Sequence, residues 1–218
     1  VTIPYFTFAV GRYGIVTDSV GYSIGLRNGD RILTVDNQQV ENFLHITPDI
    51  VLNDRKTIQV ERDGQVVNID IPKEFVQKML KGKGKIEPRT PFGPFVVESF
   101  AKESPGKDAG VALDDELIGL DDKKFTYFDE FKTYLFENKD HPVVLNLLHK
   151  GDTLTTTVTP TSAGLLGINR SGVFLDKIFE FKTVKYGFLQ SVPAGIAKGF
   201  KTIGDYLKQF KLLFAKHS

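Results

Sequence analysis

Hydrophobic and polar residues alternate along two stretches of the chain, residues 56–72 and 141–160. Alternation with a period of two is typical of half-buried strands, and the Asp-Gly and Gly-Asp pairs in these stretches tolerate the positive φ of a hairpin turn. Just before each stretch, at 43–53 and 127–138, apolar residues recur instead at helical spacing. The pattern therefore predicts, twice, a short helix followed by a hairpin.

A glycine-led turn precedes both pairs of elements. Gly25–Leu33 reads GLRNGDRIL and Gly110–Ile118 reads GVALDDELI, and the two begin 85 residues apart (110 − 25). In each copy the first glycine suits the left-handed residue at the end of a short helix, and Gly29 or Asp114 then makes the turn into a strand. The agreement continues into the two hairpins. We therefore predict two copies of one small β-rich module.

The composition is that of an ordinary globular chain, with 41% hydrophobic and 25% charged residues among 218. This length allows two domains with separate cores. The net charge of +1 gives no general attraction to nucleic acid, so no nucleic-acid partner is expected. The chain has no cysteine, which excludes disulfides and thiolate metal sites. It lacks a long apolar run and a signal peptide, and we expect it to be a piece of a longer protein.

The two glycine-led stretches resemble the signature of PDZ domains of the bacterial, circularly permuted kind. That signature reads A-G-L-x-x-G-D-x-I, followed by a tight turn, a groove helix and a final hairpin. Ser104-Pro105 and Ala109-Gly110 match it in the second copy, and Gly29-Asp30 matches it in the first. The resemblance implies an α+β, mainly β fold, in which each PDZ domain is a small β-barrel or sandwich with two helices. The expected divisions are PDZ domain 1 at 1–75, a linker or binding loop at 76–84, PDZ domain 2 at 85–162, and a C-terminal strand and amphipathic helix at 163–218.

PDZ domains bind a partner's C-terminal tail as an added strand, and a loop of backbone N–H groups captures the terminal carboxylate. In the permuted form, the resemblance implies that this loop and strand precede the signature. The peptide-binding candidates are Gly82, Gly84, Lys85, Ile86 and Glu87 for domain 2, and Phe6, Thr7, Phe8, Ala9 and Val10 for domain 1. The alternatives are a solvated linker for the first set and a plain core strand for the second. A groove is expected between Phe6–Val10 and the helix that contains His45.

Apolar residues also recur at steps of four and three near the end of the chain. On a helix they lie within an arc of roughly 80°, with lysines off that arc. This predicts an amphipathic helix that either packs on the second module, or lies on a membrane surface or leads to a transmembrane span. The candidate membrane-facing residues are Ile196, Phe200, Ile203, Leu207, Phe210 and Phe214.

The order of these features resembles the extracytoplasmic region of RseP-type site-2 proteases. Two PDZ signatures are followed by GLLGI at Gly164–Ile168, a Tyr-Gly step at 186–187 and the amphipathic helix. The resemblance implies a regulatory, substrate-gating region on the periplasmic side of a bacterial inner-membrane zinc metalloprotease. Such a region acts as a size filter or as a sensor of C-terminal peptides. The implied substrates are the C-terminal ends of membrane proteins such as anti-sigma factors, and remnant signal peptides.

No catalytic or metal site is expected in this chain itself. In the family an H-E-x-x-H helix and a later Asp hold Zn²⁺, so zinc is expected in the parent protein and no cofactor in this fragment. None of His45, His141, His149 and His217 is followed by Glu, and no two are four residues apart. Serine-nucleophile and phosphate-loop motifs are also missing. Two other functions stay open: a periplasmic adaptor that binds protein C-termini, and the PDZ part of an HtrA-like serine protease, against which the amphipathic tail counts.

Overall fold

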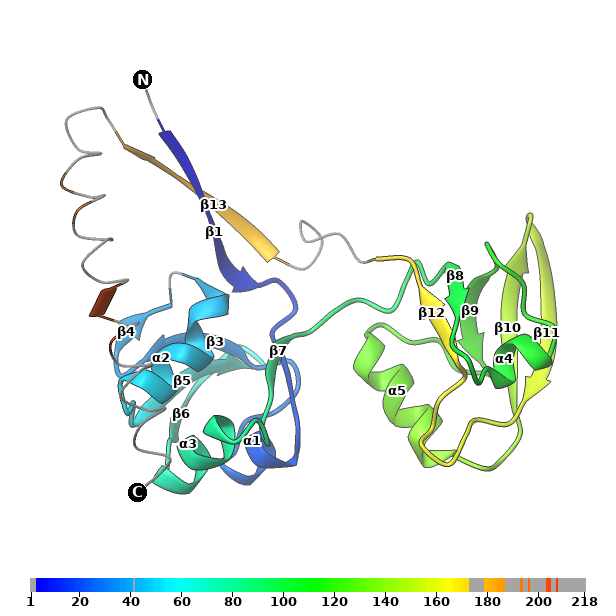
Figure 1. Cartoon of the computed structure of the whole chain (residues 1–218), viewed down its shortest axis with the longest axis horizontal. Coiled ribbons are helices and arrows are strands. Elements are labelled where there is room, and N and C mark those ends of the chain that lie inside the picture. The colour runs from blue at the N-terminus through cyan, green and yellow to red at the C-terminus, as the bar shows by residue number, and fades with distance from the viewer. Residues whose placement is uncertain are drawn as a thin grey trace. The chain divides into compact units, whose positions relative to one another are not determined.

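The computed structural model describes residues 3–40, 42–172 and 179–186, together with Pro193, Ile196, Ile203, Gly204 and Leu207. The chain forms two compact units, which are described separately (Figure 1). Unit 1 comprises Val1–Pro88 with Phe179–Ser218, and unit 2 comprises Arg89–Ile178. The fold is mixed α+β with more strand than helix, as expected. No sheet among the described residues closes into a barrel.

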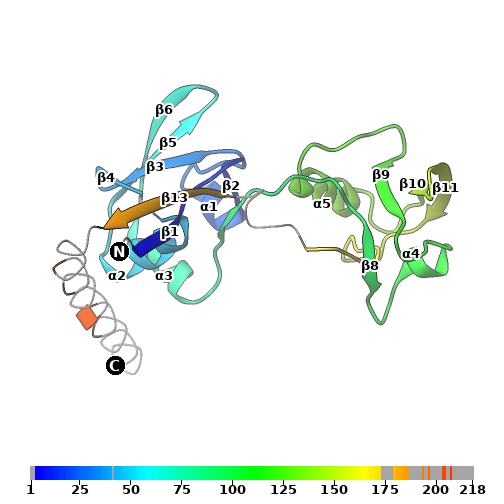
Figure 2. The ribbon, with the colours of Figure 1, turned by 90° about the horizontal axis from the view of Figure 1, so that it is seen from above.

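Unit 1 is built around a four-stranded antiparallel sheet. Its strands, in spatial order, are β4 (Gln38–Gln39), β3 (Arg31–Val35), β5 (Thr57–Arg62) and β6 (Gln65–Asp70). β5 and β6 form the first predicted hairpin (Figure 2). Because the alternation sends every second side chain to one face, Ile58 and Val60 reach the core and are 0% exposed.

Short helices connect the strands of unit 1. They are α1 (Ser19–Ser23), the 3-10 turn η1 (Phe43–His45), α2 (Ile46–Leu52) and α3 (Lys73–Leu80). α2 lies in the segment where helical spacing was predicted, and it buries Ile46 and Ile50. α3 was not predicted. It begins directly after the hairpin and buries Phe75, Val76 and Met79, which share one face of the helix.

Two further strand pairs belong to unit 1, and both are antiparallel. One joins β2 (Ile15–Thr17) to β7 (Ile86–Pro88). The other joins β1 (Ile3–Gly11), near the N-terminus, to β13 (Phe179–Tyr186), with an irregularity between Phe8 and Val10. A strand was expected in the C-terminal segment, but its pairing with the N-terminal strand could not be read from the residues.

Unit 2 contains the second predicted hairpin. Its elements are β8 (Val97–Phe100), α4 (Pro105–Asp108), β9 (Glu116–Leu120), α5 (Phe128–Glu137), β10 (Val143–His149), β11 (Asp152–Val158) and β12 (Ile168–Arg170). β9, β10 and β11 form a three-stranded sheet with β10 in the centre, and β12 pairs with β8. A cluster of aromatic rings fills the space between α5 and the strands, with Phe92, Phe95 and Phe131 all buried and in edge or tilted contact.

The repeat predicted from the sequence is visible in the backbone hydrogen bonds of the two units. In unit 1 the Ile15 amide donates to Asp30 O, and the Gly29 amide donates to Ile15 O. In unit 2 the Val97 amide donates to Asp115 O, and the Asp114 amide donates to Val97 O. Asp114 occupies the left-handed region with φ 66°, as predicted for the residue that replaces Gly29.

The boundaries of the two units differ from those expected for the two domains. The linker was placed at 76–84, whereas 76–80 is the second half of α3, whose Val76 and Met79 are buried in unit 1. Ile86–Pro88 was assigned to the second module, whereas β7 pairs with β2 in unit 1. β12, in turn, comes from the segment after 162 and pairs with β8 of unit 2. Each unit therefore ends with a short strand that lies beyond its hairpin.

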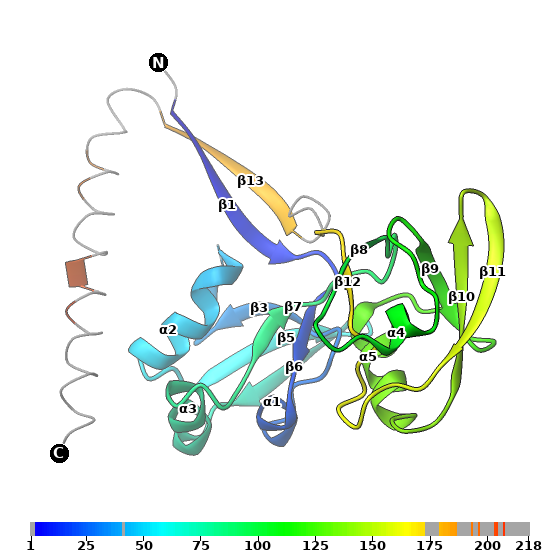
Figure 3. The same cartoon turned by 45° about the vertical axis from the view of Figure 1, so that its right-hand side comes forward.

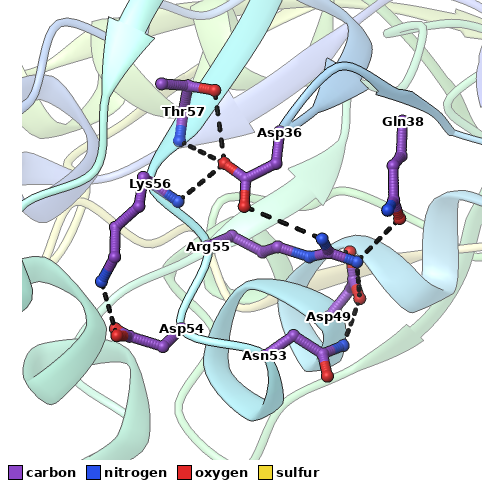
Figure 4. A network of polar contacts seen from close by, with 8 residues as sticks. All are labelled: Asp36, Gln38, Asp49, Asn53, Asp54, Arg55, Lys56 and Thr57. Carbon is purple, nitrogen blue, oxygen red and sulfur yellow. Dashed lines mark hydrogen bonds and ion pairs between the residues drawn. The ribbon is translucent and has the colours of Figure 1, made fainter.

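A polar network fixes the chain around α2 in unit 1 (Figure 4). Asp36, in the turn after β3, accepts hydrogen bonds from the backbone amides of Lys56 and Thr57 at 2.8 and 2.9 Å. Arg55 lies between Asp36 and Asp49, with its Nε 3.0 Å from Asp49 Oδ2 on α2. The network therefore ties α2 to the β3 turn and to the start of β5.

The stability of unit 1 should depend on the charge of Asp36. Burial raises the pKa of the Asp36 carboxyl, but the amides of Lys56 and Thr57 and the charge of Arg55 outweigh it, so the pKa lies below 3.8. A carboxyl whose pKa is lowered by folding stabilises the protein above its unfolded pKa, and this contribution is lost as the pH falls through the folded pKa. Asp36→Asn should therefore lower the free energy of unfolding by about 1 kcal/mol at neutral pH. It should also reduce the acid limb, the fall in the free energy of unfolding as the pH drops below 3.8.

Urea denaturation across this pH range, followed through amide signals of unit 1, measures the effect. Asp54→Asn is the matched control, because the Asp54 side chain is 63% exposed and forms its ion pair with the exposed Lys56 ammonium. An acid limb that is the same in Asp36→Asn as in the unchanged protein would contradict the assignment.

Candidate functional site

The same short strand pair occurs in both units, and it is the strongest candidate for a binding site. In unit 1 β7 runs antiparallel to β2, with Ile86 opposite Thr17. In unit 2 β12 runs antiparallel to β8, with Ile168 opposite Phe100. In both cases the second strand comes from the chain that follows the hairpin. Within the described part of the chain, β7 and β12 each have a single neighbouring strand, so each has one open edge.

The loop that leads into each of these strands contains a glycine in the left-handed region at the same distance from the strand. Gly82 has φ 66° and lies four residues before Ile86, and Gly164 has φ 70° and lies four residues before Ile168. In unit 1 the Thr17 hydroxyl donates to Lys85 O, and in unit 2 the Ser104 hydroxyl donates to Leu166 O. We refer to residues 81–85 as loop 1 and to residues 163–167 as loop 2. The two loops occupy equivalent positions in the repeat.

The backbone of β12 alternates between its two edges. The Ala101 amide donates to Gly167 O, and the Ser171 amide donates to Val96 O, so the odd-numbered residues face β8. The irregularity in the pairing skips a residue of β8, which leaves the alternation of β12 intact. Because neighbouring residues of a strand direct their N–H and C=O groups to opposite edges, Ile168 and Arg170 face the open edge. Such an edge is able to pair with another extended chain.

The segment from loop 2 to the end of β12 runs alongside α5, in the opposite direction (Figure 1). At one end, a Cβ added to Gly164 would lie 2.7 Å from Phe136 Cα, near the end of the helix. At the other end, the Arg170 guanidinium lies over the ring of Phe128, 4.1 Å from its centroid, at the start of the helix. Loop 2 therefore lies close to the end of α5, and the Arg170 side chain at the end of β12 reaches the start of the helix.

Arg170 is the most strongly held side chain of β12. It donates to Pro91 O and Phe92 O at 2.9 and 3.0 Å and to Thr90 Oγ1 at 3.2 Å. Burial lowers the pKa of the guanidinium below its ordinary value, and it still remains charged at neutral pH. None of the described carboxylates forms an ion pair with it. The site in unit 2 thus has a positive charge at the end of β12, beside the start of α5.

The residues predicted to bind peptides are distributed over two different strands of unit 1. Gly82, Gly84, Lys85, Ile86 and Glu87 lie in loop 1 and β7, which places them in unit 1 rather than in the second module (Figure 3). Phe6, Thr7, Phe8, Ala9 and Val10 lie in β1, which pairs with β13. β1 contacts η1, which contains His45. The structure therefore does not bring the two predicted sets together as equivalent strands of a repeat.

The equivalent residues in unit 2, Gly164–Arg170, were not predicted to bind. The sequence did contain a signal for them, because 82–86 and 164–168 share one pattern. Each begins with glycine, continues with two residues that differ between the copies, and ends with Gly or Lys followed by isoleucine. That similarity lies beyond Pro72 and Pro160, where the repeat was taken to end. In unit 1, helix α3 lies between Pro72 and loop 1, so loop 1 is farther from its hairpin in sequence than loop 2 is from Pro160. An alignment of the two copies that starts from the hairpins therefore does not match the loops.

Most of the predicted amphipathic helix lies outside the described residues, including Phe200, Phe210 and Phe214. The described ones, Ile196, Ile203 and Leu207, are helical and are 56%, 56% and 64% exposed. Among the described residues, no helix has the length and apolar character needed to cross a bilayer.

The described residues contain no cluster of three or more His, Asp or Glu side chains that would hold a metal ion. His149 is engaged with the buried carboxylate of Asp115. A hollow of about 280 Å³ lies on the β3–β4 side of unit 1, and it is lined by both strands, with Arg31 its one charged lining residue. The described residues therefore supply no set of zinc ligands.

Comparison with known proteins gives a partial relationship. No family model matches the chain. A protein of Clostridium perfringens named "Putative zinc metalloprotease" is 30% identical over 94 residues, which is 42% of this chain and 28% of the relative. A protein of Bartonella henselae with the same name is 32% identical over 79 residues, which is 36% of this chain and 20% of the relative. The chain thus spans less than a third of the relatives it matches, and it is similar to a part of zinc metalloproteases.

Proposed function

We propose that this chain is a tandem PDZ region of a site-2-type zinc metalloprotease. In this proposal each unit is a permuted PDZ domain, and the chain has a non-catalytic role. The similarity to parts of two zinc metalloproteases supports the proposal that the parent protein is such a protease. Its Zn²⁺ would be held by residues outside this chain. The region would lie on the extracytoplasmic side of a bacterial inner membrane. The exposed apolar residues Ile196, Ile203 and Leu207 suit contact with the membrane surface.

The proposed role is to receive the C-terminal ends of membrane-protein substrates and so to gate their access to the protease. The observation that carries it is the repeated arrangement of a short strand with one open edge that follows a glycine-containing loop. An extended peptide would pair with the open edge of β7 or β12, and backbone N–H groups of loop 1 or loop 2 would meet its terminal carboxylate. A steric size filter would need neither of these features.

Binding should therefore depend on the peptide's free carboxylate. We expect a short apolar peptide to shift the amide signals of loop 2 and β12, and its C-terminal amide to bind at least about tenfold more weakly, because capture of a charged chain end is worth roughly 1.4 kcal/mol or more. Titration of the isotopically labelled chain measures both. Shifts confined to β1 would contradict these sites, and equal binding of acid and amide would contradict chain-end capture.

A further inference from the structure

Loop 1 and loop 2 occupy equivalent positions but carry different side chains. Counting back from the isoleucine that begins each strand aligns Lys83 with Leu165, Gly84 with Leu166 and Lys85 with Gly167. The backbone has nearly the same φ at Gly82 and Gly164 and differs at the last loop residue, where Gly167 has φ 66°. The loops also differ in the side chains that they present to a bound chain end. The difference is one of charge against apolar surface.

Loop 1 is a lysine loop. Lys81, Lys83 and Lys85 are all exposed, and none of them forms an ion pair with the described residues of the chain. The loop itself contains no acidic residue to offset them. Three cations within five residues raise the local concentration of anionic groups, and this attraction is screened by salt because the side chains lie in water.

Loop 2 presents apolar surface in the same place. Leu165 is 55% exposed, and Phe136, on the part of α5 that packs against Gly164, is 56% exposed. The Lys139 ammonium lies over the Phe136 ring, 4.6 Å from its centroid. An apolar last residue would cover Leu165 and Phe136 and remove them from water, while its carboxylate would remain within the field of one lysine.

From this difference we propose that the two sites select different chain ends: the unit 1 site takes acidic C-termini and the unit 2 site takes apolar ones. The inference rests on the proposed capture of chain ends at these loops and adds the chemical class that each one accepts. Specificity is a difference between two affinities, so the lysines of loop 1 need only favour an acidic end, and the exposed apolar pair at loop 2 need only favour an apolar end. A protein with both sites would accept two classes of trimmed substrate.

Two hexapeptides that share their first four residues and end in two leucines or in two glutamates test this proposal. Each is titrated into the labelled full chain, and the amide signals of residues 81–86 and 163–168 are followed. We expect the leucine peptide to bind at loop 2 at least about tenfold more tightly than at loop 1, and the glutamate peptide to show the reverse order. Only the glutamate peptide at loop 1 should weaken strongly when the salt is raised from about 0.05 to about 0.5 M.

Exchange of one residue between the loops provides matched variants. Lys83→Leu should move loop 1 toward the leucine peptide, and Leu165→Lys should move loop 2 toward the glutamate peptide. Both side chains are exposed, so neither change should alter the fold. Equal responses of both loops to both peptides, unchanged in the variants, would overturn the selectivity and leave chain-end capture standing. No response of either loop to either peptide would overturn the proposed function as well.

Discussion

Replacing Gly164 with alanine should destabilise unit 2 by about 3 kcal/mol, because a strained backbone and a steric clash add together. The residue has φ 70°, a conformation that costs an alanine roughly 1–2 kcal/mol. Its Cβ would also lie 2.7 Å from Phe136 Cα and 3.0 Å from Phe136 N, and backbone atoms of a helix cannot turn away as a side chain does. Loop 2 or α5 would have to move, so peptide binding at β12 should be lost as well.

Gly82→Ala is the matched control in the other unit. Gly82 has φ 66°, but no atom lies within 4 Å of an added Cβ. This variant should therefore lose only about 1 kcal/mol of unit 1 stability, from the backbone conformation alone, and β7 should stay in place. Urea denaturation of both variants, with separate reporters for the two units, measures the difference. Equal losses in the two variants would contradict the close packing of loop 2 on α5.

The second large effect is expected at the buried carboxylate of unit 1. The Asp30 side chain is 0% exposed, and the Arg62 guanidinium donates to both of its oxygens at 2.7 Å and also to Gly25 O. Arg62→Met would leave a buried charge with one remaining hydrogen bond from the described residues, donated by the Arg27 amide. Removing one partner of such a pair should cost unit 1 about 3 kcal/mol.

Two further variants make this prediction specific. Arg31→Met removes an exposed arginine from the neighbouring strand and should change stability by less than about 0.5 kcal/mol. Adding Asp30→Asn to Arg62→Met should recover part of the loss, because the amide carries no charge to leave unpaired. Thermal or urea unfolding of unit 1 measures each variant. A loss below about 1 kcal/mol for Arg62→Met would show that water replaces the guanidinium.

Much of the internal repeat could be predicted because its elements have strong local signals. The hairpins β5–β6 and β10–β11 follow from strict alternation and their turn glycines, and Gly25 and Gly110 adopt the positive φ that the helix ends required. These features depend on neighbours within a few residues, so the local sequence alone predicts them.

The strands that form the candidate site could not be predicted in the same way. β7 and β12 have three residues each, too few to show a periodicity, and each pairs with a strand about 70 residues away in sequence. Only tertiary structure reveals that Ile168 lies opposite Phe100. The expected pairing strand, Phe6–Val10, had the stronger local pattern, and its partner β13 lies beyond the whole of unit 2.

Amide hydrogen exchange along β12 tests the central claim, that a chain end adds to an open strand edge, most directly. The measurement compares the labelled chain alone and with the leucine-ended peptide in its free-carboxylate form. The account predicts that exchange slows at Ile168 and Arg170, which face the open edge, and changes little at Asn169, which already faces β8. Unchanged exchange at Ile168 and Arg170 with saturating peptide would contradict it.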